Sequence, residues 1–153
     1  QLLTQAVGRA GRGERTGSAV IQTYQPEHYS IICAAQQDYD NFYQKEIAYR
    51  DLLDYPPVSG MMGILGFGKD EQQLATAMDY IRQFICRADK NRNYQIIGPT
   101  VPSVGKVQDV YKKILYVKDR EEDRLRKLKD QVESYVQINS GFRELHIQFD
   151  FHI

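Results

Sequence analysis

The sequence has few of the residues that build redox and metal centres. Its 153 residues include no tryptophan, two cysteines and three histidines. Cys33 and Cys86 are far apart and neither belongs to a Cys-x-x-Cys pair, a pattern that favours buried, reduced thiols in a cytoplasmic protein. His28, His146 and His152 are also scattered, so we expect solvated histidines and no metal site.

The sequence also lacks long apolar runs and an excess of charge of either sign. No apolar stretch approaches the roughly 20 residues that a membrane-spanning helix needs. Twenty basic and 20 acidic residues give a formal net charge of zero. This balance counts against a strongly basic nucleic-acid module, although affinity for nucleic acid depends on local phosphate contacts. A length of 153 residues suits one domain, or one small domain with an appendage.

A Gly-Lys-Ser/Thr sequence, the end of a P-loop, does not occur anywhere in the chain. The backbone and lysine that hold nucleotide phosphates in such a loop are therefore missing. We expect the chain by itself not to hydrolyse ATP and to bind no cofactor. Glu121-Glu122-Asp123 does not change this expectation, because acids in a first helical turn complement the helix dipole.

What the chain does contain is a glycine- and arginine-rich motif at its start. The motif is Gln5-x-x-Gly8-Arg9-Ala10-Gly11-Arg12-Gly13. Guanidinium forks match phosphate oxygens, and glycines allow a tight turn. The motif resembles the last motif of superfamily-two helicases, which lies on the second motor lobe. A basic surface loop is the alternative, and a chain that opens inside such a motif is expected to be a piece of a longer protein.

The helicase resemblance implies roles for five residues of the motif. Arg9 and Arg12 would contact phosphate and, with Gln5, take part in ATP hydrolysis, since a positive fork at the γ-phosphoryl group lowers the barrier. Gly8 and Gly11 would complete the nucleotide-binding turn.

Later segments narrow the resemblance to one family. They are Gln22-Thr23-Tyr24-x-Pro26, Asp38-Tyr39-x-x-Phe42-Tyr43, Glu46-x-x-x-Arg50, Tyr55-Pro56-Pro57, Ile97-Gly98-Pro99 and Val110-Tyr111-Lys112-Lys113. Over essentially its whole length the chain resembles the primosomal protein N′ family, ATP-dependent 3′→5′ DNA helicases of replication restart. The resemblance implies ATP and magnesium in the longer protein, and zinc whose ligands lie upstream of this chain. It also implies forked or single-stranded DNA, single-stranded DNA-binding protein and other primosome proteins as partners.

The resemblance and the hydrophobic periodicity together predict three parts. They are the end of motor lobe 2 (1–26), a connecting helical segment (27–57) and a C-terminal domain (58–153). We expect residues 1–12 to begin as a short helix and residues 18–24 to form a strand without neighbours. Residues 27–54 contain the first long helical region, whose aromatic stripe is expected to pack in a core, and Pro56-Pro57 ends it.

The C-terminal part predicts an α+β fold of the ferredoxin-like, β-α-β-β-α-β kind. The expected elements are a strand over 58–67, a helix capped by Asp70 and running to Ala88, strands over 94–97 and 110–118, a helix starting at Asp119, and a strand over 145–153. The helices would bury Leu74, Met78, Ile81, Ile85 and Ala88, and Leu125, Leu128, Val132 and Tyr135. Asp70 with Gln73, and Asp119 with Glu122, have capping-box spacing.

The candidate DNA contacts surround a breaker-rich loop over 98–106. They are Lys106, Tyr111, Lys112 and Lys113, with Lys118 further along the strand. Lysine on phosphate beside a ring on a base is the chemistry of single-strand binding. Strand alternation sends Lys112 and Lys113 to opposite faces. The alternative is that these lysines only protect a sheet edge, and a second basic run, 124–129, reads as a solvated helix face.

Two rival functions stay open at this point. The chain could be a stand-alone ferredoxin-like protein-interaction domain, or an RNA-binding module with aromatics on an exposed sheet face. Phe149 and Phe151 lie on the apolar face expected to meet the helices, which weakens the RNA interpretation.

Overall fold

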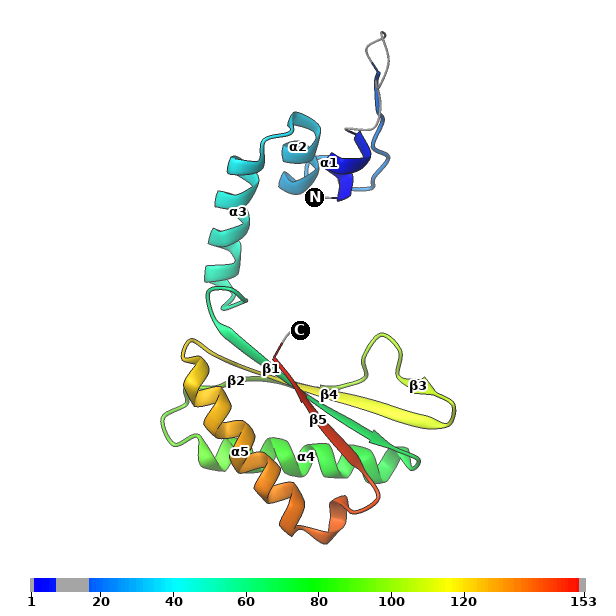
Figure 1. The fold of residues 1–153 in the computed structure, drawn as a ribbon, viewed down its shortest axis with the longest axis vertical. Helices are drawn as coiled ribbons and strands as arrows, with labels where there is room; N and C mark the ends of the chain where they lie inside the picture. The colour runs from blue at the N-terminus through cyan, green and yellow to red at the C-terminus, as the bar shows by residue number, and fades with distance from the viewer. Residues whose placement is uncertain (1, 8–16, 152–153) are drawn as a thin grey trace. The chain divides into compact units, whose positions relative to one another are not determined.

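The computed structural model describes residues 2–7 and 17–151. The chain divides into two compact units, called unit 1 (Gln1–Leu52) and unit 2 (Leu53–Ile153) below. Figure 1 shows the order of their helices and strands.

The regular elements among the described residues of unit 1 are three helices: α1 (Leu2–Val7), α2 (Tyr29–Gln36) and α3 (Tyr39–Leu52). The helical region predicted within 27–54 is present and consists of two helices, because Gln37 adopts a left-handed conformation (φ 55°) and ends α2. The Asp38 carboxylate then accepts a hydrogen bond from the Asn41 backbone N–H (3.0 Å), which begins α3. This is an ordinary C-cap followed at once by an N-cap.

Two expectations for unit 1 are corrected. The strand predicted over residues 18–24 is absent, and this segment pairs with no described strand, since an isolated strand leaves its backbone groups unsatisfied. The aromatic stripe of α3 does not form a core: α3 has no buried residue, and Tyr39 is 68% exposed. Tyr29 of α2 instead contacts Phe42, with ring centroids 6.1 Å apart, and its hydroxyl donates to Glu46.

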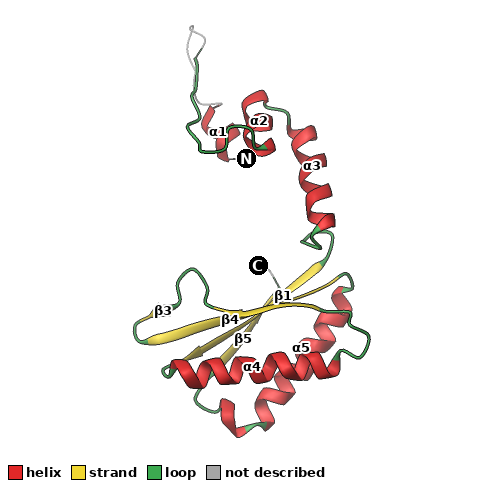
Figure 2. Cartoon of the chain, turned by 180° about the vertical axis from the view of Figure 1, so that it is seen from behind, coloured by secondary structure: helices red, strands yellow, loops and turns green. Residues whose placement is uncertain are grey.

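Unit 2 is an antiparallel sheet with two helices packed on one face (Figures 1 and 2). Its elements are β1 (Gly60–Gly68), α4 (Glu71–Ala88), β2 (Gln95–Thr100), β3 (Lys106–Val107), β4 (Val110–Asp119), α5 (Glu122–Ile138), a 3-10 turn (Ser140–Phe142) and β5 (His146–Asp150). The strand order is β2-β4-β1-β5, with β3 paired to β4. The predicted α+β, ferredoxin-like class is confirmed. The short β3 was not predicted, and β2 extends through Gly98 to Thr100 into the expected loop.

The two predicted helix starts have different outcomes. The Asp70 carboxylate accepts hydrogen bonds from the backbone N–H groups of Gln72 and Gln73 (both 2.8 Å), as expected for a cap. Asp119 does not cap α5, which begins after Glu121. Asp119 is the last residue of β4, and its buried carboxylate accepts from Arg124 instead.

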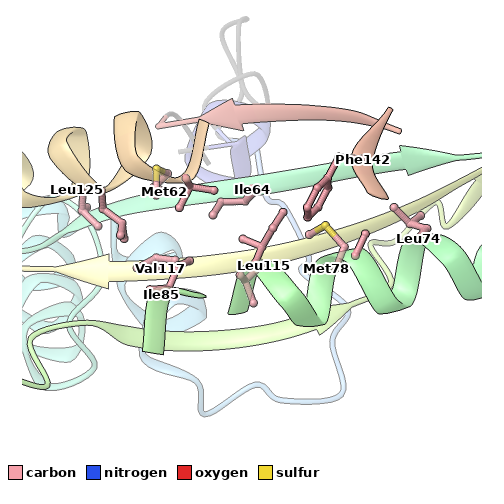
Figure 3. Packing of buried hydrophobic residues seen from close by; sticks show 13 residues of the cluster. Met62, Ile64, Leu74, Met78, Ile85, Leu115, Val117, Leu125 and Phe142 are labelled. Atoms are coloured by element: carbon pink, nitrogen blue, oxygen red, sulfur yellow. The ribbon is translucent and has the colours of Figure 1, made fainter. Parts of the chain in front are cut away.

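The core of unit 2 lies between the sheet and the two helices (Figure 3). Its buried members are Met62, Ile64, Leu74, Ala77, Met78, Ile81, Ile85, Leu115, Val117, Leu125, Leu128, Val132 and Phe142. The predicted helical stripes are confirmed except that Ala88 is exposed and Tyr135 is partly buried. Gly66 makes the close packing of α4 possible, because a β-carbon there would lie 2.6 Å from the Met78 sulfur.

Three other expectations concern the last strand, the two cysteines and membrane-spanning helices. Leu145, Ile147, Phe149 and Phe151 pack against the core, while the predicted continuation of the strand through His152 and Ile153 lies outside the described residues. Cys33 is buried, but Cys86 is exposed, so the expectation of two buried thiols is wrong for Cys86. Within the described chain, no helix is long and apolar enough to cross a membrane.

Candidate nucleic-acid interface

The sheet of unit 2 has one face covered by α4 and α5 and one face that these helices leave open (Figure 2). Side chains alternate between the faces along a strand, and directly paired residues on neighbouring strands share a face. Gly66 faces α4, since its nearest neighbours are Met78 and Leu74. Phe67 therefore points to the open face, with its partners Lys112 on β4 and His146 on β5.

The open face carries a cluster formed by Phe67, Lys112 and His146. The Phe67 and His146 ring centroids are 5.7 Å apart, and Lys112 Nζ lies 5.8 Å from the Phe67 ring centroid. His146 is exposed, while Phe67 and Lys112 are partly exposed. Three neighbouring strands thus bring a ring, an imidazole and an ammonium group together on one surface.

The remaining predicted contacts lie on the opposite face of β4. Tyr111 packs against the core, so Lys113, two residues on, also lies on the side of the helices, near the start of α4. Lys106 is opposite Tyr111 across β3 and β4, with Lys106 Nζ 4.6 Å from the Tyr111 ring centroid. The predicted separation of Lys112 and Lys113 is confirmed by the unbroken register between β1 and β4.

The candidate lysines differ in how far acids neutralise them. Lys106 Nζ is 3.0 Å from the Asp109 carboxylate and 3.4 Å from the Tyr111 hydroxyl. The hydrogen bond to Asp109, followed by that to Tyr111, raises the pKa of Lys106 above its ordinary value. Lys112 and Lys113 make no ion pair with any described residue, so their charges are available to a ligand.

Lys118 is not available to a ligand. It is 3% exposed, and its Nζ donates a hydrogen bond to the Leu53 carbonyl oxygen (3.1 Å). The same ammonium group lies 3.5 Å from the centroid of the Tyr55 ring. Lys118 therefore holds residues 53–55 against the sheet.

The basic run of α5 is largely paired with acids. Arg124 bonds both carboxylate oxygens of Asp119 (2.6 and 2.7 Å). Burial alone would raise the pKa of Asp119, but the hydrogen bonds from Arg124 and the Glu121 N–H, with the charge of Arg124, outweigh it and lower that pKa below its ordinary value. Two further pairs on this helix are Arg126 with Glu122 (2.7 Å) and Lys129 with Glu133 (2.5 Å). The interpretation as a solvated, charge-paired face agrees with this geometry.

Sequence reasoning did not single out Phe67, and it treated His146 as solvated only. The signal was present in the alternation of β1, where the buried Ile64 and the closely packed Gly66 assign Phe67 to the other face. His28 also has a structural contact, since its Nδ1 accepts from the Ser30 N–H (3.3 Å) at the start of α2. Among the described residues, no group of His, Cys, Asp or Glu could hold a metal ion.

The nucleotide motif is described only in part. Gln5 lies in α1 with an exposed side chain. Gly8, Arg9, Gly11 and Arg12 lie outside the described residues, so their predicted roles stay predictions.

Comparison with known proteins gives consistent matches. No family model matches the chain. The replication restart protein PriA of Bacillus subtilis is 35% identical over 125 residues, which cover 82% of this chain and 15% of that protein. PriA of Synechocystis is 33% identical over 118 residues (77% of this chain, 14% of that protein), and PriA of Thermotoga maritima 31% over 125 residues (82% and 16%). The chain therefore spans about one seventh of the length of these relatives.

Fold and matches together define the class of the chain: a helical unit followed by an α+β, ferredoxin-like domain, with a sequence similar to part of a longer replication restart protein. The chain belongs to the replication restart protein PriA family, of which it represents a segment.

Proposed function

We propose that the chain is the C-terminal part of a superfamily-two, ATP-dependent 3′→5′ DNA helicase that recognises stalled forks and restarts replication by primosome assembly. The observation that carries the proposal is the 35% identity to a replication restart protein over 82% of the chain. In this proposal, unit 2 helps to bind branched or single-stranded DNA and braces the motor. Single-stranded DNA-binding protein and other primosome proteins are the partners.

The start of the chain would contribute to the motor. Arg9 and Arg12 would contact ATP phosphates across the cleft between two motor lobes, Gln5 would support hydrolysis, and Gly8 and Gly11 would shape the turn. ATP, magnesium and zinc would be bound by the longer protein. The support for these roles is the Q-x-x-G-R-x-G-R spacing of residues 5–12.

A test of the motor role uses the full-length protein that contains this chain. Arg12→Ala should reduce DNA-stimulated ATP turnover at least 100-fold, because a missing arginine finger costs about 10³–10⁵ in rate. DNA binding without nucleotide should be unchanged. Turnover equal to that of the wild type would contradict the motor role, as would ATP hydrolysis by the 153-residue chain alone.

The DNA role of unit 2 is supported by Lys112 and Lys113, two lysines at the same end of β4 that form no ion pair with any described residue. A test measures binding of the purified chain to dye-labelled forked DNA across a salt series. Each lost phosphate contact should reduce the slope of log K against log salt by about one.

Lys113→Glu is expected to weaken fork binding and reduce that slope. Lys127→Glu is the matched control, because Lys127 is exposed on α5 and its substitution changes the net charge by the same amount as Lys113→Glu. Absence of fork binding at low salt would contradict the DNA role, and equal losses in the two variants would reduce it to general charge attraction.

A further inference from the structure

The aromatic ring of Phe67 lies on the open face of the sheet, outside the core between the sheet and the helices. Phe67 lies on β1 between Gly66 and Gly68, and a β-carbon at either glycine would meet core side chains, Met78 or Leu145, at 2.6 Å. The helix-facing side of this part of β1 is therefore already filled. By strand alternation Phe67 projects from the other side of the sheet, which is the face that α4 and α5 leave open (Figure 2).

The neighbours of Phe67 complement a nucleotide. His146 extends the aromatic surface on one side and Lys112 supplies a positive charge on the other. Neighbouring strands lie about 4.8 Å apart, so the three side chains span roughly 10 Å. A base stacked on the Phe67 ring would leave its phosphate within reach of Lys112.

The charge around this cluster favours a polyanion. Lys112 has no acidic partner among the described residues, and the next open-face residues of β1 and β5 are the uncharged Leu65 and Gln148. Asp150 is the closest open-face acid of β5, and it lies opposite Gly63, two open-face positions beyond Phe67.

We propose that Phe67, His146 and Lys112 form a base-stacking site for single-stranded DNA. The Phe67 ring, flanked by His146, stacks on a base, and Lys112 binds the adjoining phosphate. An aromatic platform beside a cation is the usual way of holding single strands without reading their sequence. This site rests on the proposed function, since it names the DNA form that unit 2 binds and the residues that bind it.

The experiment compares two oligonucleotides in a fluorescence anisotropy titration of the purified chain. One is a 12-residue oligothymidylate and the other is the same backbone with abasic sites. Phe67→Leu, which keeps an apolar side chain but removes the ring, should weaken oligothymidylate binding roughly 5- to 100-fold. The same variant should bind the abasic strand as the wild type does, because no base is left to stack.

Matched controls separate stacking from folding and charge. Tyr80→Leu removes a ring that is 52% exposed on α4 and should change neither titration. His146→Ala alters an exposed residue and should weaken oligothymidylate binding without affecting the abasic strand, which keeps the test valid if Phe67→Leu does not fold. Lys112→Glu should weaken binding to both strands and reduce the salt slope by about one, unlike Lys127→Glu.

The outcomes distinguish this site from the proposed function. If the wild type binds DNA and neither Phe67→Leu nor His146→Ala weakens oligothymidylate binding, the stacking site is wrong and the DNA role of unit 2 stands. If the wild type binds no DNA at low salt, both are wrong. Tighter binding to oligouridylate than to oligothymidylate would overturn the assignment to DNA.

Discussion

The two units differ in where their apolar side chains lie. In the described chain, every buried hydrophobic residue except Cys33 and Ala34 belongs to unit 2. Unit 1 instead exposes Tyr39 (68%) and Leu52 (79%) on α3. Both units have apolar residues at helical spacing, but among the described residues only those of unit 2 form a sheet that helices can cover. The difference shows that a helical stripe identifies a packing surface and does not guarantee that the same chain supplies its partner.

The largest expected effect is the difference in unfolding free energy lost when a buried residue of unit 2 and an exposed residue of unit 1 are truncated. Leu115→Ala removes a side chain that is fully buried between the sheet and the helices and should cost unit 2 about 2–5 kcal/mol of unfolding free energy. Tyr39→Ala in the exposed stripe of α3 should cost less than about 0.5 kcal/mol. Urea unfolding followed by circular dichroism measures both. Similar losses in the two variants would mean that α3 shares the core.

A smaller effect concerns the ion pair between Asp119, at the end of β4, and Arg124 in α5. Asp119→Asn should cost about 1–3 kcal/mol at pH 7, because it removes charge-assisted hydrogen bonds to Arg124. The pKa of Asp119 is lowered in the folded state, so this stabilisation is present above the unfolded pKa of about 4 and is lost as the pH falls through the folded value.

The difference in urea midpoint between the wild type and Asp119→Asn should therefore shrink as the pH falls below about 4. Asp130→Asn is the control, since its side chain is 76% exposed and 3.5 Å from Lys129. A difference that stays constant with pH would show that Asp119 acts by shape alone.

The first residues of unit 2 are held against its sheet by Lys118. Lys118→Met removes the hydrogen bond to Leu53 and the contact with the Tyr55 ring, interactions worth roughly 1–2 kcal/mol together. The Val58 amide, which donates to the Tyr55 carbonyl oxygen (3.1 Å), should then exchange its hydrogen faster. Lys113→Met on the same strand should leave that rate unchanged. Equal exchange rates of the Val58 amide in Lys118→Met and the wild type would show that Lys118 does not hold residues 53–55 in place.

The smallest expected effect lies within unit 1. Tyr29→Phe removes the hydroxyl that donates to Glu46 and should cost about 0.5–1.5 kcal/mol. This hydrogen bond, with burial, raises the pKa of Tyr29 to about 12. Its stabilisation is present below pH 10 and is lost as the pH rises through about 12.

Alkaline titration of tyrosine absorbance measures this directly. In the wild type, one of the 11 tyrosines should ionise near pH 12. This ionisation step should be absent from the curve of Tyr29→Phe. Tyr43→Phe, which alters a ring that is 49% exposed, is the control and should leave the ionisation near pH 12 in place. A Tyr29→Phe curve that loses only ordinary tyrosine absorbance would contradict the contact with Glu46.

Sequence reasoning succeeded where a local pattern has one structural solution. Asp70 was predicted as a cap and is one, and the stripe of Leu74, Met78, Ile81 and Ile85 is buried. It failed at Asp119, whose spacing to Glu122 matches a cap, because Arg124 one turn further on competes for the same carboxylate. A spacing rule cannot weigh two partners for one side chain.

The candidate site was predicted in its residue types and only in part in its arrangement. Lys106, Tyr111, Lys112 and Lys113 were chosen from one stretch of chain. The structure divides them between two faces and pairs Lys112 with Phe67, which lies 45 positions earlier in the chain. Long-range pairing of this kind depends on sheet register, which local periodicity does not specify.

The amino-acid sequence by itself determined the family, the α+β class and the faces of the two long helices, because these depend on motifs and on periodicities of 2 and 3.6 residues. The tertiary structure alone decided that Lys118 is buried, that Asp119 bonds Arg124, and that Phe67, Lys112 and His146 meet on one open face. Each of these contacts joins residues through the packing of strands and helices, and their energies depend on which groups the fold brings within a few ångströms.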